Sequence, residues 1–151
     1  MTLHEEEQVC PRALDRVTWA LRRTELAVTA LKEQRLRSLG MPAAHYALLI
    51  AVYADPGLAG AELARRLNVT PQAVASLVAR LEDRGQLERR PHPRHRHVQE
   101  LHLTDTGHDA LSKADAVIVE IEQQISEKLG AKDTGQLKAL LDQVTEAIQQ
   151  A

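Results

Sequence analysis

The stretch that most constrains how this chain folds is residues 61–103, where two short amphipathic segments and a turn precede two alternating segments. In AELARRLNVTPQAVASLVARLEDRG, apolar residues recur every three or four positions, which predicts helices over 61–67 and 71–84. Thr70 is a favourable N-cap and Pro71 a favourable first helical residue. The sequence therefore predicts two short helices joined by a tight turn, with a hairpin directly after them.

The predicted hairpin is strongly basic. Strands are expected at 87–91 and 98–103, because Leu101 and Leu103 alternate with polar neighbours. The first eleven residues of the hairpin contain four arginines and three histidines but a single acid, Glu88. The basic residues are Arg89, Arg90, His92, Arg94, His95, Arg96 and His97. A segment this cationic is suited to a phosphate backbone.

Charge is distributed unevenly along the chain. The formal net charge is −2, which by itself argues against a nucleic-acid partner. Residues 61–100, however, hold eight arginines and five acids, whereas the rest of the chain holds eleven basic and sixteen acidic residues. A basic centre between acidic flanks produces a local field that attracts a polyanion, whatever the total charge.

The composition fits a single, mainly helical domain. At 151 residues, with 44% apolar and 26% charged residues, the chain is long enough to bury a core. One Trp, two Tyr and no Phe leave Leu, Val, Ile and Ala to build that core, which suits packed helices. We expect no membrane span and no secretion, because no apolar stretch is long enough and the acidic N-terminus lacks a signal-like segment. One cysteine excludes an internal disulfide and fits the reducing cytoplasm.

Longer helices are predicted on both sides of the basic centre. A heptad-like stripe predicts one helix over 12–39, and a second helix follows over about 42–54. Thr104 caps a helix predicted over 105–129, and a capping-box-like start at 133–136 opens the last helix. Apolar stripes at both ends of so small a chain favour a dimer seam, and an internal helix bundle is the alternative.

A helix-turn-helix is one interpretation of residues 61–84. In that motif the first helix braces across the DNA backbone while the second enters the major groove. Ala64 supplies a small residue where the helices cross, and Val74 a buried contact from the second helix. Gln72 then faces outward to read an adenine edge, and Ala73 to touch a thymine methyl. The alternative is a plain helical hairpin with a solvated face.

The basic hairpin favours the DNA-binding interpretation. Arginine suits both phosphates and a narrow minor groove, and solubility alone does not explain so many cations directly after the second helix. The residues predicted to contact DNA are Thr70, Gln72, Ala73, Ser76, Arg80, Arg89, Arg90, Arg94 and Arg96.

Together these stretches resemble the MarR family of bacterial transcriptional regulators. The similarity rests on ELARRLNVTPQAVASLVARLEDRGQLERR, on a P-x-P-x-x-R spacing in the hairpin and on LTDTG, and it covers roughly 42–107. The resemblance implies a winged helix-turn-helix that binds pseudo-palindromic operators as a homodimer. It further implies a repressor released by a small molecule or an oxidant, with 71–84 as the recognition helix and Arg96 at the wing tip.

The resemblance also gives a domain organisation. The fold class is mainly α with a small β-hairpin wing and about six helices, in a single domain over 1–151. The terminal helices, 12–39 and 105–150, are expected to form a dimerisation region, and residues 42–103 the winged helix-turn-helix lobe.

Two positions depart from the family's pattern. His92 stands where the family usually has an aspartate that orients the wing arginine, so a rigid wing does not follow from the resemblance. Ser76 stands where the family often has an arginine on the recognition helix, so we expect weaker or altered base readout and more affinity from the wing.

The wing histidines suggest a pH dependence. Three imidazoles, which titrate near pH 6.5 in reference peptides, should gain protons beside phosphates. DNA affinity is then expected to rise as the pH falls from about 7.5 to 6. The alternative is that these histidines are solvated spacers.

Candidates for a sensing role lie mainly in the first two helices. A redox switch through Cys10 is one hypothesis, because some relatives sense oxidants through a cysteine near the N-terminus, and an incidental thiol is the alternative. The resemblance places an effector pocket between the dimer helices and the DNA-binding lobe. The candidate contacts, each of which has ordinary packing as its alternative, are Arg16, Trp19, His45, Tyr46 and Tyr53.

An enzyme is the least supported class. The sequence has no Gly-rich phosphate loop, no nucleophile elbow and no catalytic constellation, and its histidines lack metal-ligand spacing. We therefore expect no cofactor and no metal. The rival class is a winged-helix protein-interaction module whose wing docks on an acidic partner. The expected partners are double-stranded DNA, a second copy of the chain and a small-molecule effector, and no membrane.

Overall fold

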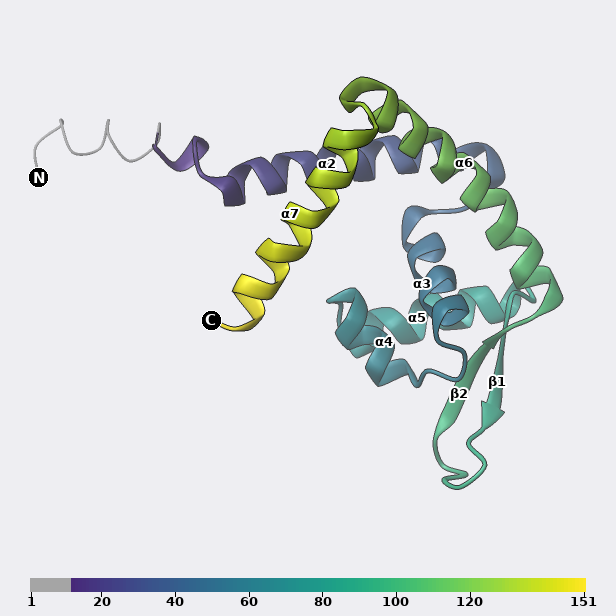
Figure 1. Cartoon of the computed structure of the whole chain (residues 1–151). Coiled ribbons are helices and arrows are strands. Elements are labelled where there is room, and N and C mark those ends of the chain that lie inside the picture. Colours follow the sequence, from purple (N-terminus) through teal and green to yellow (C-terminus); the bar gives the residue numbers. More distant parts are fainter. Residues whose placement is uncertain (1–11) are drawn as a thin grey trace, which may run out of the picture.

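The computed structural model describes residues 12–151, and from Val17 onward the chain forms six α-helices and a two-stranded hairpin (Figure 1). The helices are α2 (Val17–Leu36), α3 (Ala43–Ala54), α4 (Gly60–Leu67), α5 (Pro71–Asp83), α6 (Asp105–Leu129) and α7 (Ala131–Gln149), with a 3-10 turn η1 (Arg37–Leu39) after α2. The strands are β1 (Leu87–Pro91) and β2 (Gln99–Leu103). This architecture confirms the predicted fold class.

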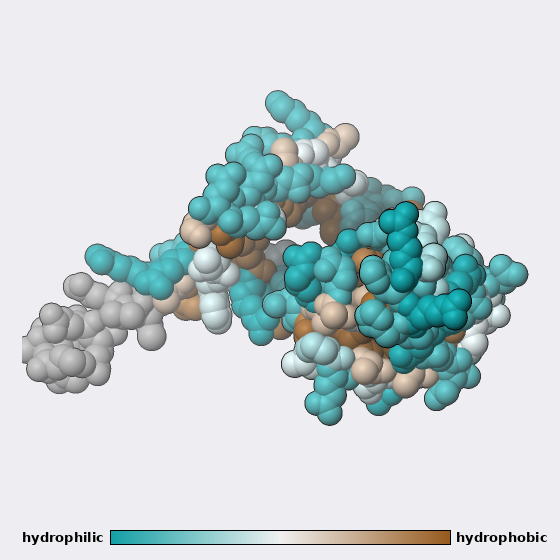
Figure 2. All heavy atoms as spheres, turned by 90° about the horizontal axis from the view of Figure 1, so that it is seen from below, coloured by the Kyte–Doolittle hydropathy of each residue, from teal (hydrophilic) through white to brown (hydrophobic). Residues whose placement is uncertain are grey.

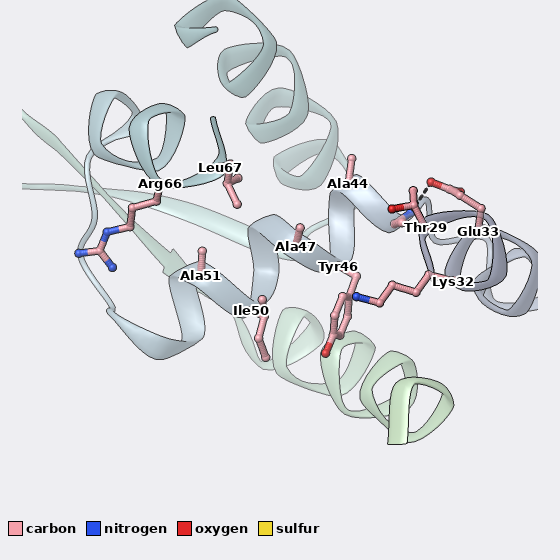
Figure 3. A pocket seen from close by; sticks show the side chains of 11 residues that line it. Thr29, Lys32, Glu33, Ala44, Tyr46, Ala47, Ile50, Ala51, Arg66 and Leu67 are labelled. Carbon is pink, nitrogen blue, oxygen red and sulfur yellow. Dashed lines mark hydrogen bonds between the residues drawn. The ribbon is translucent and has the colours of Figure 1, made fainter. Parts of the chain in front are cut away.

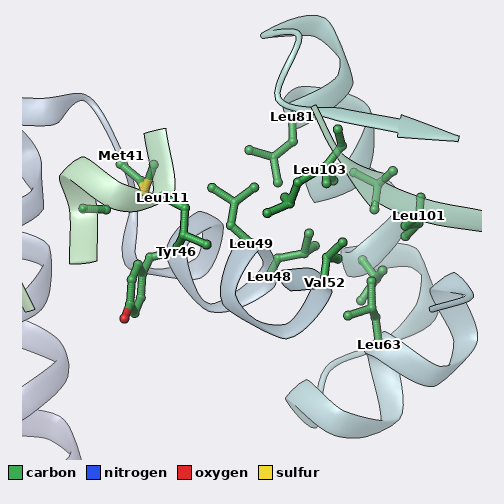
Figure 4. Close-up of a cluster of buried hydrophobic side chains, with 14 of the residues drawn as sticks. Met41, Tyr46, Leu48, Leu49, Val52, Leu63, Leu81, Leu101, Leu103 and Leu111 are labelled. Carbon is green, nitrogen blue, oxygen red and sulfur yellow. The ribbon is translucent and has the colours of Figure 1, made fainter. Parts of the chain in front are cut away.

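Helices α3, α4 and α5 and the hairpin form one lobe around a core of leucine and valine (Figure 4). Leu48, Leu49 and Val52 of α3 are at most 1% exposed, and so are Leu63 of α4 and Leu81 of α5. Along α3 and α5 the buried positions recur every three or four residues, as helical periodicity requires. Their burial provides the main stabilisation of the lobe, because apolar area removed from water is the dominant favourable term in folding.

The hairpin is attached to the lobe through its second strand. β1 and β2 are antiparallel, with Leu87 opposite Leu103. On its other edge, β2 pairs with the turn after α3: Gly57 N donates to Leu101 O (2.9 Å), and Leu101 N donates to Leu58 O (3.0 Å). At the base of the wing, β2 is therefore paired on both edges, with β1 on one side and with residues 57–58 on the other.

The start of α6 lies directly on the segment that leaves α5. Thr104 caps α6 by accepting a hydrogen bond from Gly107 N (3.0 Å), and its hydroxyl donates to the carbonyl of Gly85. Its backbone N–H donates to Gln86 O (3.2 Å). A Cβ at Gly107 would lie 2.0 Å from Gln86 O, so glycine alone allows this approach. The two ends of the hairpin are thus fixed against each other.

Helix α7 and the first part of α2 extend away from the lobe (Figure 1). No residue of α7 is buried, and its apolar side chains Leu137, Leu140, Leu141 and Ile148 are 39–63% exposed. Seen from below, this arm stands apart from the lobe and exposes apolar side chains among polar ones (Figure 2). Despite these exposed apolar residues, none of the described helices is long and apolar enough to cross a bilayer.

Two predicted helix boundaries are wrong. The helix predicted over 12–39 is interrupted, because Arg16 is extended (φ −74°, ψ 146°) and serves as N-cap of α2, and its far end is the 3-10 turn η1. The last helix begins at Ala131, because Gly130 (φ 83°) redirects the chain within one residue. Thr134 then donates to the carbonyl of Gly130 (2.7 Å) instead of opening a capping box.

Candidate nucleic-acid interface

Helix α5 is held with one face in the core and the opposite face exposed. Thr70 accepts a hydrogen bond from Ala73 N (3.1 Å) and Pro71 occupies the first turn, as the sequence predicts. Asn68 makes the turn from α4 in the left-handed region (φ 52°), which asparagine tolerates better than most residues. On the inner face, Val74 is 1% exposed. This local chemistry fixes which side of α5 is presented to a partner.

The exposed face of α5 carries the side chains predicted to contact DNA. These exposed residues are Thr70, Gln72, Ala73, Ser76 and Arg80. Arg80 is the one charged residue among them, so the face offers hydrogen bonds and apolar contacts more than positive charge. Just beyond the helix, Arg84 donates to the carbonyl of Gly40 (3.0 Å), which ties the end of α5 to the segment between η1 and α3.

Two of the wing arginines are paired with acids at the base of the wing. Arg89 Nε donates to Glu82 Oε1 (2.8 Å), which links β1 to α5. Arg90 is paired with Glu88 on its own strand. The positive charge of both guanidinium groups is therefore partly compensated before any anion approaches.

The wing tip is closed by the side chain of His92. Its Nδ1 accepts hydrogen bonds from the backbone N–H groups of Arg94 and His95, each at 3.1 Å. The backbone N–H of His92 donates to Val98 O (2.9 Å), and Val98 N donates to His95 O (2.8 Å). Arg94 and Arg96 are exposed on this tip, and neither has an acidic partner within residues 12–151.

Helix α4 carries two arginines that the sequence analysis did not single out. Arg65 and Arg66 both bond Glu62, at 2.6 and 3.1 Å, and Arg66 also bonds Asp55 at 2.8 Å. These bonds, with Arg65 contributing most, lower the pKa of Glu62 to about 2. The sequence could have predicted these bonds, because Arg65 and Arg66 follow Glu62 by three and four residues on the same helix. The cations of α4 are thus largely compensated by their own neighbours.

A hollow of about 580 Å³ lies between α2, α3 and α4 (Figure 3). Small apolar residues of α3 form its floor, and Lys32, Tyr46 and Arg66 contribute polar groups. Figure 3 shows the amino group of Lys32 directed toward Tyr46. Tyr46 donates from its hydroxyl to Asp115 Oδ1 (3.0 Å), and burial together with this bond raises the pKa of Tyr46 to about 12.

The structure does not bring the five predicted effector residues together. Of these, Tyr46 lines the hollow, whereas Arg16 and Trp19 are exposed at the start of α2 and Tyr53 is 56% exposed. His45 is buried in the core, as described below. The candidate redox residue, Cys10, lies outside the described residues. Residues 12–151 contain no group of three or more His, Cys, Asp or Glu side chains placed to hold a metal ion.

Comparison with known proteins identifies this arrangement. Residues 39–96 match a model of the MarR family. The HTH-type transcriptional repressor Rv2887 of Mycobacterium tuberculosis is 29% identical over 109 residues, which are 72% of this chain and 78% of that protein. The chain is therefore similar to MarR-family proteins over this region.

Solved structures show the same similarity. The transcriptional repressor CouR bound to a 23-mer DNA duplex is 25% identical, with a TM-score of 0.79 over 87% of this chain and 93% of CouR. The Rv2887 complex with DNA is 27% identical, with a TM-score of 0.73 over 85% of this chain and 97% of that one. The family-model match begins at the end of η1 and ends in the wing tip, so it contains α3, α4, α5 and β1.

One predicted effector residue is a buried histidine of α3. His45, near the start of α3, is 2% exposed, and neither ring nitrogen has a hydrogen-bond partner among the described residues. Burial lowers the pKa of His45, and the nearby Arg84 and Arg80 lower it further, while Glu33 opposes them. His45 is therefore a core residue here, which is the packing alternative that the sequence left open, and it does not line the hollow.

Proposed function

We propose that this chain is a MarR-type regulator: a cytoplasmic, non-enzymatic DNA-binding protein, which represses transcription by binding a pseudo-palindromic operator as a homodimer. The observation that carries the proposal is an exposed recognition face on α5 beside a wing whose tip presents Arg94 and Arg96 without acidic partners in the described chain. The similar proteins CouR and Rv2887 are bound to DNA in their solved structures.

We assign a DNA contact to each predicted residue of α5 and the wing. Gln72 and Ser76 contact base edges in the major groove, and Ala73 contacts a thymine methyl. Arg94 and Arg96 contact phosphates or the adjacent minor groove. The remaining predicted contacts, which position the protein on the phosphate backbone, are Thr70, Arg80, Arg89 and Arg90. We assign Arg89 and Arg90 smaller contributions than the tip arginines, because each already bonds an acid.

A second copy of the chain is the proposed partner of the arm. Two recognition helices related by a two-fold axis match an operator with two half-sites. The apolar side chains exposed on α7 and at the start of α2 supply a seam away from the lobe. In this proposal 12–39 and 105–150 form the dimerisation region, and 42–103 the DNA-binding lobe.

The hollow between α2, α3 and α4 is the proposed effector site. Lys32 suits a carboxylate, and Tyr46 together with the alanine-rich floor suits an apolar ring. Arg66 also lines the hollow, but its guanidinium already bonds Glu62 and Asp55. Rv2887 has been solved in complex with salicylic acid, and that structure is 26% identical to this chain with a TM-score of 0.72. Because the hollow joins an arm helix to the lobe, a ligand there changes how the two are held and so releases DNA.

Fluorescence anisotropy with the DNA upstream of the chain's own gene tests the proposal. We expect saturable binding that an unrelated duplex of equal length competes for poorly, and that weakens steeply with salt, by about 0.9 in log–log slope for each neutralised phosphate. Salicylate should lower the affinity. A complete lack of binding to duplex DNA at low salt contradicts the proposal and favours the protein-interaction alternative.

A further inference from the structure

The wing tip depends on the protonation state of one side chain. His92 Nδ1 receives two backbone N–H groups, from Arg94 and His95, so this nitrogen must carry a lone pair and the ring proton must lie on Nε2. A proton on Nδ1 would direct a donor at two other donors. The observed tip is therefore compatible with the neutral imidazole and incompatible with the imidazolium.

The imidazole of His92 takes the place of a short acid or amide. In an Asx turn, the side-chain oxygen of aspartate or asparagine accepts N–H groups two and three residues further along the chain. Nδ1 is separated from Cα by two atoms, as that oxygen is, and it accepts from residues two and three positions on. His92 thus closes the same turn but adds no negative charge beside Arg94 and Arg96.

The surroundings of His92 do not offset a new charge. The ring of His95 stacks on it with ring centres 5.3 Å apart, and His97 lies 6.0 Å beyond His95. The other charged groups near the tip are Arg94 and Arg96, Arg89 paired with Glu82 of α5, and Glu88 paired with Arg90. Glu100 lies 3.4 Å from His102, and this contact is an ion pair only when that ring is protonated. Within residues 12–151, none of these carboxylates forms an ion pair with His92.

We propose that His92 is the positioning residue of the wing: its neutral Nδ1 closes the tip and presents Arg94 and Arg96 to DNA, and its protonation opens the tip and weakens binding. Imidazoles change charge between about pH 5 and 8, so the effect falls in an accessible range. This loss of DNA affinity on protonation is opposite in sign to the gain expected from protonating His95 and His97 beside phosphates. The inference rests on the proposed DNA binding.

The experiment uses matched variants of the full chain to separate the loss of affinity on protonating His92 from the gain on protonating His95 and His97. Anisotropy titrations are run from pH 8 to pH 5.5 at fixed ionic strength, in a His95→Gln/His97→Gln background. In that background we expect affinity to fall as the pH falls. Adding His92→Asn should keep the affinity at pH 8, because the amide oxygen accepts the same N–H groups, and should remove the fall. Adding His92→Ala should weaken binding about fivefold at pH 8, the effect of about one net hydrogen bond.

Two results would overturn the inference. One is an unchanged affinity of the His92→Ala variant at pH 8, and the other is the same pH profile with and without His92→Asn. Nitrogen NMR of the free protein gives a reading that does not depend on DNA. We expect a neutral His92 with its proton on Nε2, and amide shifts of Arg94 and His95 that titrate with it. A proton on Nδ1 at pH 8 contradicts the inference, whereas failure of DNA binding alone contradicts only the proposed function.

Discussion

At the scale of single residues, Gly107 determines how α6 approaches the rest of the lobe. Its Cα faces the backbone of Gln86, which leaves no room for a Cβ. Thr104 makes two hydrogen bonds across the same contact, to the carbonyls of Gly85 and Gln86, and its hydroxyl also accepts the capping bond from Gly107 N. The LTDTG motif of the sequence therefore forms a close backbone contact between the segment that leaves α5 and the start of α6.

Gly107→Ala should lower the free energy of unfolding by about 3 kcal/mol, because the new methyl must displace a backbone carbonyl in a packed contact. Gly135→Ala is the matched control, since a Cβ there meets nothing within 4 Å on helix α7. That variant should gain about 0.5–1 kcal/mol from helix propensity. Urea denaturation measures both, and equal stabilities of the two variants would contradict the packing argument.

His45 should make folding stability depend on pH. Its pKa is lowered in the folded chain, mainly by burial, so the unfolded chain takes up a proton first as the pH falls. The unfolded state then binds more protons, and the free energy of unfolding should fall below about pH 6.5, by at most about 1.4 kcal/mol per pH unit. In His45→Leu, which removes two unpaired buried nitrogens, this part of the slope should disappear. Urea denaturation at pH 5, 6 and 7 tests this, with the exposed His95→Gln as the control that keeps the slope.

At the scale of elements, the wing divides into a paired base and an unpaired tip. Arg89 and Arg90 each bond an acid, which makes them structural as well as cationic. Arg94 and Arg96 lie beyond the last ladder pair, Pro91 with Gln99. The wing therefore concentrates its available charge at the point farthest from the core.

Arg96→Ala should weaken DNA binding across all sequences and lower the log–log salt slope by about 1, the signature of one lost phosphate contact. Arg90→Ala should change the slope less, because its guanidinium is already paired with Glu88. Anisotropy at four salt concentrations measures both slopes. A larger effect of Arg90→Ala than of Arg96→Ala would show that the tip is not the main electrostatic contact.

Local signals predicted some elements closely and missed others. Helix α6 occupies the predicted 105–129, because Thr104 and Gly130 are strong start and stop residues. The break at Arg16 was missed, since the apolar stripe has the same spacing on both sides of it. The candidate site was also predictable only in part. The outer face of α5 follows from the helical periodicity of the sequence. The closure of the tip by His92 could not be predicted, because it depends on backbone amides that the loop conformation brings to the ring.

At the scale of the whole molecule, the chain is a compact lobe with an arm whose apolar side chains are exposed. Helix α7 has no buried residue, although a stripe of leucines, valine and isoleucine runs along it. An exposed apolar stripe of this kind favours an association surface. The proposed dimer would bury the stripe and set the distance between the two recognition helices.

Leu141→Glu should convert the dimer to a monomer, because it places a charge in the apolar stripe of α7. DNA binding should weaken sharply, since a monomer engages one half-site in place of two. Lys138→Glu, on the same helix, is the control for adding an acid and should remain dimeric. Sedimentation equilibrium gives the masses, and a dimeric Leu141→Glu variant would locate the seam away from α7.

The closed base of the hairpin has a consequence for how such a chain diversifies. Thr104 and Gly107, which follow β2, contact Gly85 and Gln86, which precede β1, so the ends of the hairpin are fixed independently of the tip. Substitutions in the tip then alter recognition without a penalty in folding. A descendant of this chain can therefore change its target site through substitutions in the tip, without changes in the helices.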